Sequence, residues 1–125
     1  MLSVFDLFKI GIGPSSSHTA GAARIGFLAQ KMIGGNVVRA DFTLYGSFAK
    51  TYHGHGTDRA LLGGIMGFST DDMRIRNSFE IAQETGLAYT FTPNETETEI
   101  HPNTVDISIT NKNGQTMSIR GESLG

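Results

Sequence analysis

The sequence predicts an α+β domain with a mainly antiparallel, four-stranded sheet and helices packed on one face. Helical periodicity comes mostly first along the chain, and a meander of strand-like segments follows it. Strands that follow one another closely usually pair antiparallel, with the helices segregated to one side. The 125 residues have the length of one domain, so we expect residues 1–125 to fold as a single unit.

The first part of the chain predicts a short apolar element at 2–10, a helix at about 17–33 and a strand at 38–44. The helix carries apolar side chains at i, i+3, i+4, i+7 and i+8, which form one face; they are Ile25, Leu28, Ala29, Met32 and Ile33. Gly21 and Gly26 each cost about 1 kcal/mol relative to Ala inside a helix. We therefore expect another element to pack very close to this helix.

Two further helices are expected in the middle of the chain, after a helical turn at 47–51. Thr57 or Asp58 would cap the first, and its apolar face would consist of Leu61, Leu62, Ile65 and Met66. Asn77 and Glu80 have the spacing of a capping box, which predicts a second helix that ends at Gly86.

Three strands complete the predicted sheet, at 87–91, 105–109 and 117–119, with a polar loop over 92–103. Asn113-Gly114 lies between the last two strands and is a strong signal for a hairpin.

The composition excludes several classes of function. Ten Lys and Arg against twelve Asp and Glu give a net charge of -2, which does not suit a nucleic-acid binder. The chain has no cysteine, which excludes disulfides, a thiolate nucleophile and a metal site built from its own thiolates. The N-terminal segment lacks a signal-peptide layout, and no apolar run has the length of a membrane span.

A first candidate site is the serine-rich loop GPSSSHT at 13–19, placed before a helix. Three hydroxyls, free backbone N–H groups and the positive end of the helix dipole would meet there, which suits a carboxylate or phosphate. A plain helix cap explains the serines equally simply. The loop lacks the GxxxxGK[ST] pattern of a P-loop.

The second candidate is HGHGTD at 53–58, where glycines leave two histidines open to a ligand. Histidine titrates near neutrality, so it suits a general base, and it also binds metals. His53 and His55 offer no third metal ligand at a clear spacing, and a surface turn is the plainer alternative. His101, in HPNT at 101–104, is expected to be structural or exposed, and the acidic run at 95–99 to be a solvated edge rather than a calcium site.

Together the two glycine-rich loops resemble the signatures of the iron–sulfur L-serine dehydratases. SVFDLFKIGIGPSSSHTAGAARIG at 3–26 is similar to that family's opening, and YGSFAKTYHGHGTDRALLGGIMGF at 45–68 to its second signature. HPNT and the terminal strand also resemble the family, in particular the β subunit of its two-chain form. The resemblance covers nearly the whole chain.

This resemblance implies deamination of L-serine to pyruvate and ammonia, with a [4Fe–4S] cluster as the Lewis acid and a protein base for the α-proton. His55 would be the base, and the substrate carboxylate would bind a loop made of Ser15, Ser16, Ser17, His18 and Thr19. Supporting positions would be His53, Gly54, Gly56, Thr57 and Asp58. His53 departs from the family pattern, in which many relatives carry Lys, so we expect it to be peripheral.

The resemblance also implies that the cluster is bound by a partner α subunit and that this chain holds no metal. We expect a cytoplasmic hetero-oligomer with the α subunit, or a homodimer through this domain, inactive as the isolated chain. A strand followed at once by Gly125 predicts a linker, and the family implies an ACT regulatory domain after it.

A different class of function remains open, because this type of domain also resembles the allosteric substrate-binding domain of some phosphoglycerate dehydrogenases. There the fold binds an anionic effector without chemistry, and an exposed histidine beside the anion loop would have no role. A purely structural domain is a third possibility. A pyridoxal-phosphate dehydratase is excluded, since it needs a much larger fold around a Schiff-base lysine.

Overall fold

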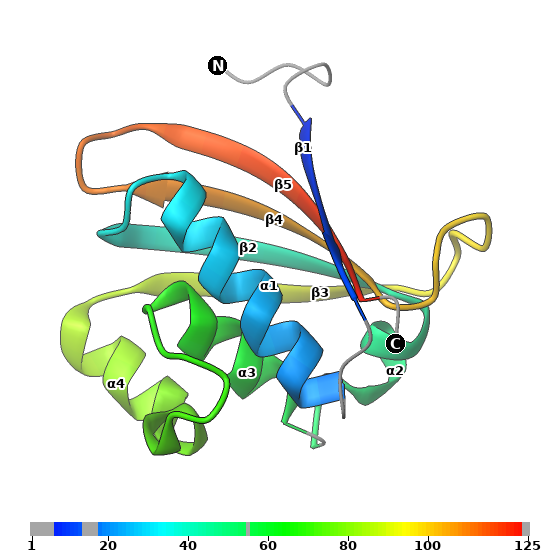
Figure 1. Ribbon diagram of the computed structural model, residues 1–125, viewed down its shortest axis with the longest axis horizontal. Helices are drawn as coiled ribbons and strands as arrows, with labels where there is room; N and C mark the ends of the chain where they lie inside the picture. The colour runs from blue at the N-terminus through cyan, green and yellow to red at the C-terminus, as the bar shows by residue number, and fades with distance from the viewer. Residues whose placement is uncertain (1–6, 14–17, 55, 124–125) are drawn as a thin grey trace.

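The computed structural model describes residues 7–13, 18–54 and 56–123 (Figure 1). It contains a five-stranded sheet in the order β1-β5-β4-β2-β3. The strands are β1 (Leu7–Ile12), β2 (Val37–Tyr45), β3 (Ala88–Asn94), β4 (Thr104–Asn111) and β5 (Thr116–Ser123). The helices are α1 (His18–Met32), α2 (Gly46–Thr51), α3 (Thr57–Ile65), the 3-10 helix η2 (Met73–Asn77) and α4 (Ser78–Thr85). Figure 1 shows α1, α3 and α4 on one side of the sheet.

The α+β class is confirmed, but the prediction of a mainly antiparallel, four-stranded sheet is wrong. The sheet is mixed: β4 pairs antiparallel with β2 and β5, whereas β1 pairs parallel with β5 and β2 with β3. The additional strand, β1, lies in the segment predicted only as an apolar element. Its partner β5 is about 110 residues away along the chain, so no local pattern specifies their pairing.

The other end of the sheet also differs from the expectation. Strand β3 continues through Pro93 to Asn94, where a loop was predicted. Proline cannot donate a hydrogen bond within a sheet, but it is tolerated on an edge strand, and β3 is an edge strand. Strands β1, β2, β3 and β5 therefore run in the same direction and end at the same end of the sheet, where β4 begins.

Most helix boundaries agree with the sequence, while the caps differ. Gly56, with φ 87°, is the N-cap of α3 in place of the expected Thr57 or Asp58. Asn77 precedes α4 as expected, but its side chain makes no capping hydrogen bond. Gly86 ends α4 in the left-handed conformation, and Gly114, with φ 81°, lies in the turn between β4 and β5. The predicted ends of α4 and the hairpin are therefore confirmed.

The core lies between the sheet and the paired helices α1 and α3. Its largest fully buried side chains include those of Phe42, Phe48, Ile25, Leu44, Leu61 and Leu62. Helix α1 packs closely on strand β5 at Gly121. An added Cβ there would lie 2.4 Å from Cγ2 of Ile25 in α1. Helix α1 is thereby fixed against the sheet at its middle.

Helices α1 and α3 run parallel and touch through their backbones. A Cβ on Gly26 would lie 2.4 Å from the Leu61 carbonyl oxygen, and one on Gly64 would lie 2.3 Å from that of Ala23. This confirms the expectation that Gly26 marks a very close neighbour. We call the contact of Gly26 and Gly64 the waist of the helix pair.

The opposite face of the sheet carries polar side chains. Arg120 forms a two-point contact with Asp106, with N–O distances of 2.7 and 2.8 Å, and the Tyr45 hydroxyl donates to Asp106 at 2.9 Å. Burial, followed by the hydrogen bond to the Asp106 carboxylate, raises the pKa of Tyr45 above its ordinary value. The same carboxylate raises the pKa of Arg120.

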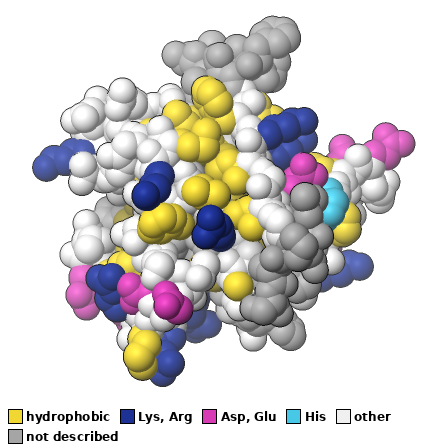
Figure 2. All heavy atoms as spheres, in the orientation of Figure 1, with side chains coloured by type: hydrophobic (Ala, Val, Ile, Leu, Met, Phe, Trp, Pro, Cys, Tyr) yellow, Lys and Arg dark blue, Asp and Glu magenta, His cyan; other side chains and the backbone are white. Residues whose placement is uncertain are grey.

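The molecular surface gives no sign of a polyanion partner on the face that carries α1. There Lys and Arg side chains lie apart from one another, some near the middle of the face and others toward its rim, and do not gather into one basic patch (Figure 2). Within the described ranges, no helix combines the length and the apolar character that crossing a membrane requires.

Candidate functional site

The N-terminal ends of α1 and α3 meet at one place. Thr19, in the first turn of α1, lies against Gly56: a Cβ on Gly56 would be 3.2 Å from Cγ2 of Thr19. Because the helices run in the same direction, the positive ends of both dipoles lie there. Such an end attracts anions, and two of them act in the same direction. We call this region the mouth of the helix pair.

The mouth contains a buried hydroxyl with an unmet hydrogen-bonding capacity. Thr57 is fully buried, and its Oγ1 has no hydrogen-bond partner among the described residues. Leaving a buried hydroxyl unpaired costs about 1–3 kcal/mol of folding free energy. The Thr57 hydroxyl is therefore a candidate for binding a ligand. Next to it, the buried carboxylate of Asp58 accepts the Arg59 N–H at 2.7 Å and so satisfies one free donor of the first turn.

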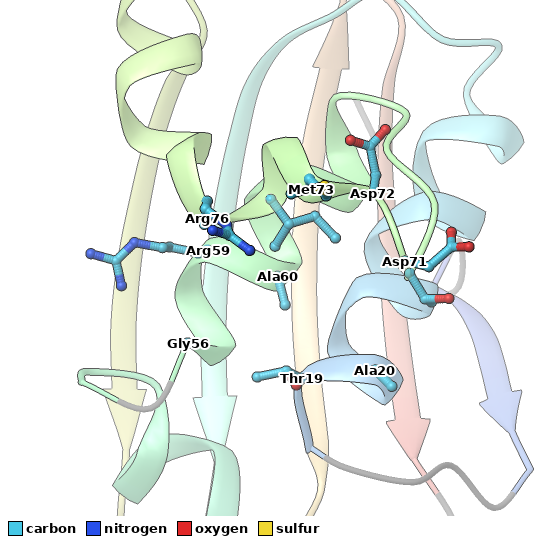
Figure 3. Close-up of a pocket in the computed structure, with 11 residues that line it drawn as sticks. Thr19, Ala20, Gly56, Arg59, Ala60, Asp71, Asp72, Met73 and Arg76 are labelled. Carbon is cyan, nitrogen blue, oxygen red and sulfur yellow. The ribbon is translucent and has the colours of Figure 1, made fainter.

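A cavity of about 540 Å³ opens beside the mouth (Figure 3). Thr19, Ala20 and Gly56 form one end of it, and Arg59 and Ala60 of α3 line it together with the segment 70–76. Figure 3 shows Asp71 and Asp72 on one side and Arg76 on the other, with Met73 between them. A small polar molecule would fit between these walls and reach the helix ends.

Most of the charged side chains around the cavity already contact another side chain. Asp72 binds Arg74 at 2.7 Å and Asp71 accepts from the Ser69 hydroxyl at 2.8 Å. Arg59 stacks over the ring of Phe79, 5.2 Å from its centroid, and Figure 3 shows its guanidinium directed away from the other lining residues. Arg76 is exposed, and among the described residues it has no ion pair. It is therefore the basic group best placed to attract an anion into the cavity.

The segment 70–76 was missed by the sequence analysis. It has no motif, and nothing in its spacing connects it with the loops at 13–19 and 53–58. Its place results from the 3-10 helix η2, which Asp72 starts by accepting the Arg74 N–H. Only the tertiary arrangement of α3 and η2 brings it next to Thr19.

The structure describes some of the predicted site residues and not others. Ser15, Ser16, Ser17 and His55 lie outside the described residues, and His18 begins α1. Thr19, Gly56, Thr57 and Asp58 come together at the mouth. His53 and Gly54 are exposed in the turn before α3, where the His53 ring lies 5.9 Å from that of Tyr52.

The chain's donor atoms do not fit an iron–sulfur cluster. It contains no cysteine, and the part of the chain that the structure describes has no group of three or more His, Asp or Glu that could hold a metal ion. Clusters of this kind are normally held by cysteine thiolates. The described residues therefore offer no ligand set for such a cluster.

Comparison with known proteins places the chain in a family. The sequence model described as "Serine dehydratase beta chain" matches residues 3–121. The chain is 49% identical over 124 residues to "L-serine dehydratase, beta chain" of Peptoniphilus asaccharolyticus, and 46% identical over 124 residues to "Probable L-serine dehydratase, beta chain" of Bacillus subtilis (strain 168). Each match covers 98% of this chain and 56% of the relative, so the chain spans about half the length of these relatives.

A third relative has a different length. "L-serine dehydratase 1" of Escherichia coli (strain K12) is 44% identical over 72 residues, which is 54% of this chain and 16% of that protein. The matched region is thus a small part of a much longer chain.

Proposed function

The chain belongs to the serine dehydratase β-chain family, and from this premise we propose that it supplies half of the active site of an L-serine dehydratase. The other half would come from an α subunit that holds a [4Fe–4S] cluster. The assembled enzyme would convert L-serine to pyruvate and ammonia. The isolated chain would be inactive, because it cannot hold the cluster itself.

The observation that carries this proposal is the mouth of the α1–α3 pair. Two helix N-termini converge beside the fully buried Oγ1 of Thr57, which bonds to none of the residues that the structure describes. L-Serine carries a carboxylate, which is the kind of group that such helix ends bind. We assign carboxylate binding to Ser15, Ser16, Ser17, His18 and Thr19, the segment that leads from β1 into α1.

His55 is the proposed general base, and it would take the α-proton of the bound serine. It directly precedes Gly56, whose left-handed backbone starts α3 and touches Thr19. This neighbourhood in the sequence supports the assignment of His55 as the base. Gly54, Gly56, Thr57 and Asp58 would hold this turn in shape, and His53 would stay at the periphery.

The test is pyruvate formation from L-serine under anaerobic conditions. The β chain containing this sequence and the cluster-bearing α subunit are assayed separately and together. We expect activity only in the mixture. Activity of the α subunit alone would assign this chain a regulatory role, and silence of the mixture with an intact cluster absorbance would favour an effector-binding domain.

His55→Ala and His53→Ala form a matched pair for the proposed base. Both remove an imidazole from the same turn, two residues apart. We expect His55→Ala to abolish turnover while the complex and its cluster absorbance remain, and His53→Ala to keep most of the activity. Near-normal turnover of His55→Ala would remove that residue from the mechanism.

A further inference from the structure

The cavity beside the mouth contains one charged side chain that is available to a ligand. Four of the described residues that line it carry a charge, namely Arg59, Asp71, Asp72 and Arg76. The first three contact another side chain of the protein. Arg76 forms no ion pair with a described residue and lies over no described aromatic ring. Its guanidinium can therefore bind a ligand without breaking a contact within this part of the chain.

The backbone on both sides of Arg76 is fixed by close packing against α3. A Cβ on Gly63 of that helix would lie 3.0 Å from Cγ1 of Ile75 and 2.9 Å from Oγ of Ser78. The Ser78 hydroxyl also donates to the Ile75 carbonyl at 2.6 Å, which ties the end of η2 to the start of α4. Helix α3 begins at the mouth, so the same rigid element positions both the mouth and Arg76.

The Arg76 side chain is directed into the cavity. Figure 3 shows its guanidinium turned toward Ala60, whereas the guanidinium of Arg59 is turned outward. Thr19 and Gly56 of the mouth line the same cavity. The cavity therefore offers a ligand both the mouth and a free guanidinium.

The charges around the cavity favour an anionic group. Asp72 is neutralised by Arg74, so the lining charges that remain among the described residues are those of Asp71, Arg59 and Arg76. These are two positive charges against one negative charge. The positive ends of two helix dipoles at the mouth act in the same sense. A carboxylate is the anionic group that an amino-acid substrate brings.

We propose that Arg76 binds the carboxylate of the amino-acid substrate, together with the segment 15–19. This inference rests on the proposed function. The planar guanidinium matches the two oxygens of a carboxylate, and such a two-point contact is stronger than hydrogen bonds between neutral groups. Helix ends supply only partial charges, so Arg76 adds a full positive charge that is directed at the ligand.

Substitution of Arg76 in the assembled α/β enzyme tests this role. A contact that is equally strong in the bound substrate and in the transition state affects KM and leaves kcat unchanged. We therefore expect Arg76→Gln to raise the KM for L-serine about 30-fold, with kcat within about twofold of the wild type. Arg76→Lys keeps the charge but loses the two-point contact, and should raise KM about fivefold.

Arg24→Gln is the matched control. Arg24 is exposed on α1, does not line this cavity, and, like Arg76, has no ion pair with a described residue. Its substitution removes the same charge from the surface of the chain. We expect its KM for L-serine to equal that of the wild type, because only a guanidinium in the cavity contacts the substrate.

A second measurement separates substrate binding from a contact with the partner subunit. Sedimentation of the α and β chains mixed at several concentrations gives the affinity of the complex. Arg76→Gln should leave this affinity unchanged, since the substrate and not the α subunit is the ligand of Arg76. A weaker complex, with a normal KM once assembly is complete, would assign Arg76 to the subunit interface and overturn the proposal.

Three kinetic results would also overturn it. They are an unchanged KM in Arg76→Gln, a loss confined to kcat, and an equal rise of KM in Arg24→Gln. An inactive wild-type complex would instead refute the proposed function, and the inference with it.

Discussion

The waist and the mouth of the α1–α3 pair are built from the same two helices in opposite ways. At the waist, Gly26 and Gly64 bring backbone against backbone, with no room for a methyl group. At the mouth, Thr19 and Gly56 touch, yet a cavity opens beside them and the buried hydroxyl of Thr57 has no partner within the described part of the chain. We therefore propose that the waist serves stability and the mouth serves binding.

The two regions depend on each other. Close packing at the waist fixes the distance and direction of both helices, and so determines where their N-termini meet. A looser contact would separate the helix ends and weaken their combined attraction for an anion. Substitutions can test whether stability and activity divide between the two regions.

The largest effect is expected at the waist. Gly64→Ala would force its methyl group to 2.3 Å from the Ala23 carbonyl oxygen, so the backbones must separate. We expect a loss of about 3 kcal/mol or more in the free energy of unfolding, measured with urea. Gly11→Ala is the control, since nothing lies within 4 Å of its Cβ position, and it should cost less than about 1 kcal/mol.

A smaller loss of stability is expected at the mouth, together with a loss of activity. Gly56→Ala must hold Ala at φ 87° and presses its Cβ against Thr19, whereas Gly67→Ala meets a similar φ of 92° in open space. Both variants should lose about 1–2 kcal/mol. Only Gly56→Ala should reduce turnover of the assembled enzyme, and an equal reduction in Gly67→Ala would contradict the division of roles.

The unpartnered hydroxyl provides a third comparison. Thr57→Val removes a buried oxygen that has no partner among the described residues, so the free energy of unfolding should stay constant or rise by about 1 kcal/mol. Thr104→Val removes an equally buried hydroxyl that donates to His101 at 2.6 Å, and should cost about 1–2 kcal/mol. Thr57→Val should raise the KM for L-serine. An unchanged KM would exclude this hydroxyl from substrate binding.

The smallest effect is expected on the sheet face opposite the α1–α3 pair. Because folding raises the pKa of Tyr45, its neutral form is favoured in the folded state. This contribution is fully present below pH 10 and is lost as the pH rises through the folded pKa. Tyr45→Phe should cost about 1 kcal/mol at neutral pH and flatten the stability curve above pH 10, followed by urea titration. Turnover at neutral pH should be unaffected.

The sequence predicted the elements well where they depend on near neighbours. The extent of α1, the turn at Gly114 and the end of α4 at Gly86 follow from spacing and local backbone preference. The predicted apolar face of α1 is confirmed only in part: Ile25, Ala29 and Ile33 are buried, whereas Met32 is exposed. The parallel pairing of β1 with β5 was missed, because it depends on a strand at the other end of the chain. The waist was half predicted: Gly26 indicated a close neighbour, but not that this neighbour is Gly64.

The candidate site was likewise predicted only where the sequence carries a local motif. Thr19, Gly56, Thr57 and Asp58 were predicted from two loops with unusual composition, and the structure brings them together. Arg76 and Asp71 lie in a segment with no motif, and reach the cavity only through the fold. Ser15, Ser16, Ser17 and His55 remain predictions, since they lie outside the described residues.

The pairing of the first strand with the last also has a consequence for synthesis. During translation, β1 leaves the ribosome early but cannot find its partner until β5 has been made, about 110 residues later. Until then β1 has no partner strand, and the entropy cost of closing so long a loop is not compensated. A nascent chain that stops before residue 116 would therefore leave β1 unpaired, so the complete sheet forms only once β5 has been translated.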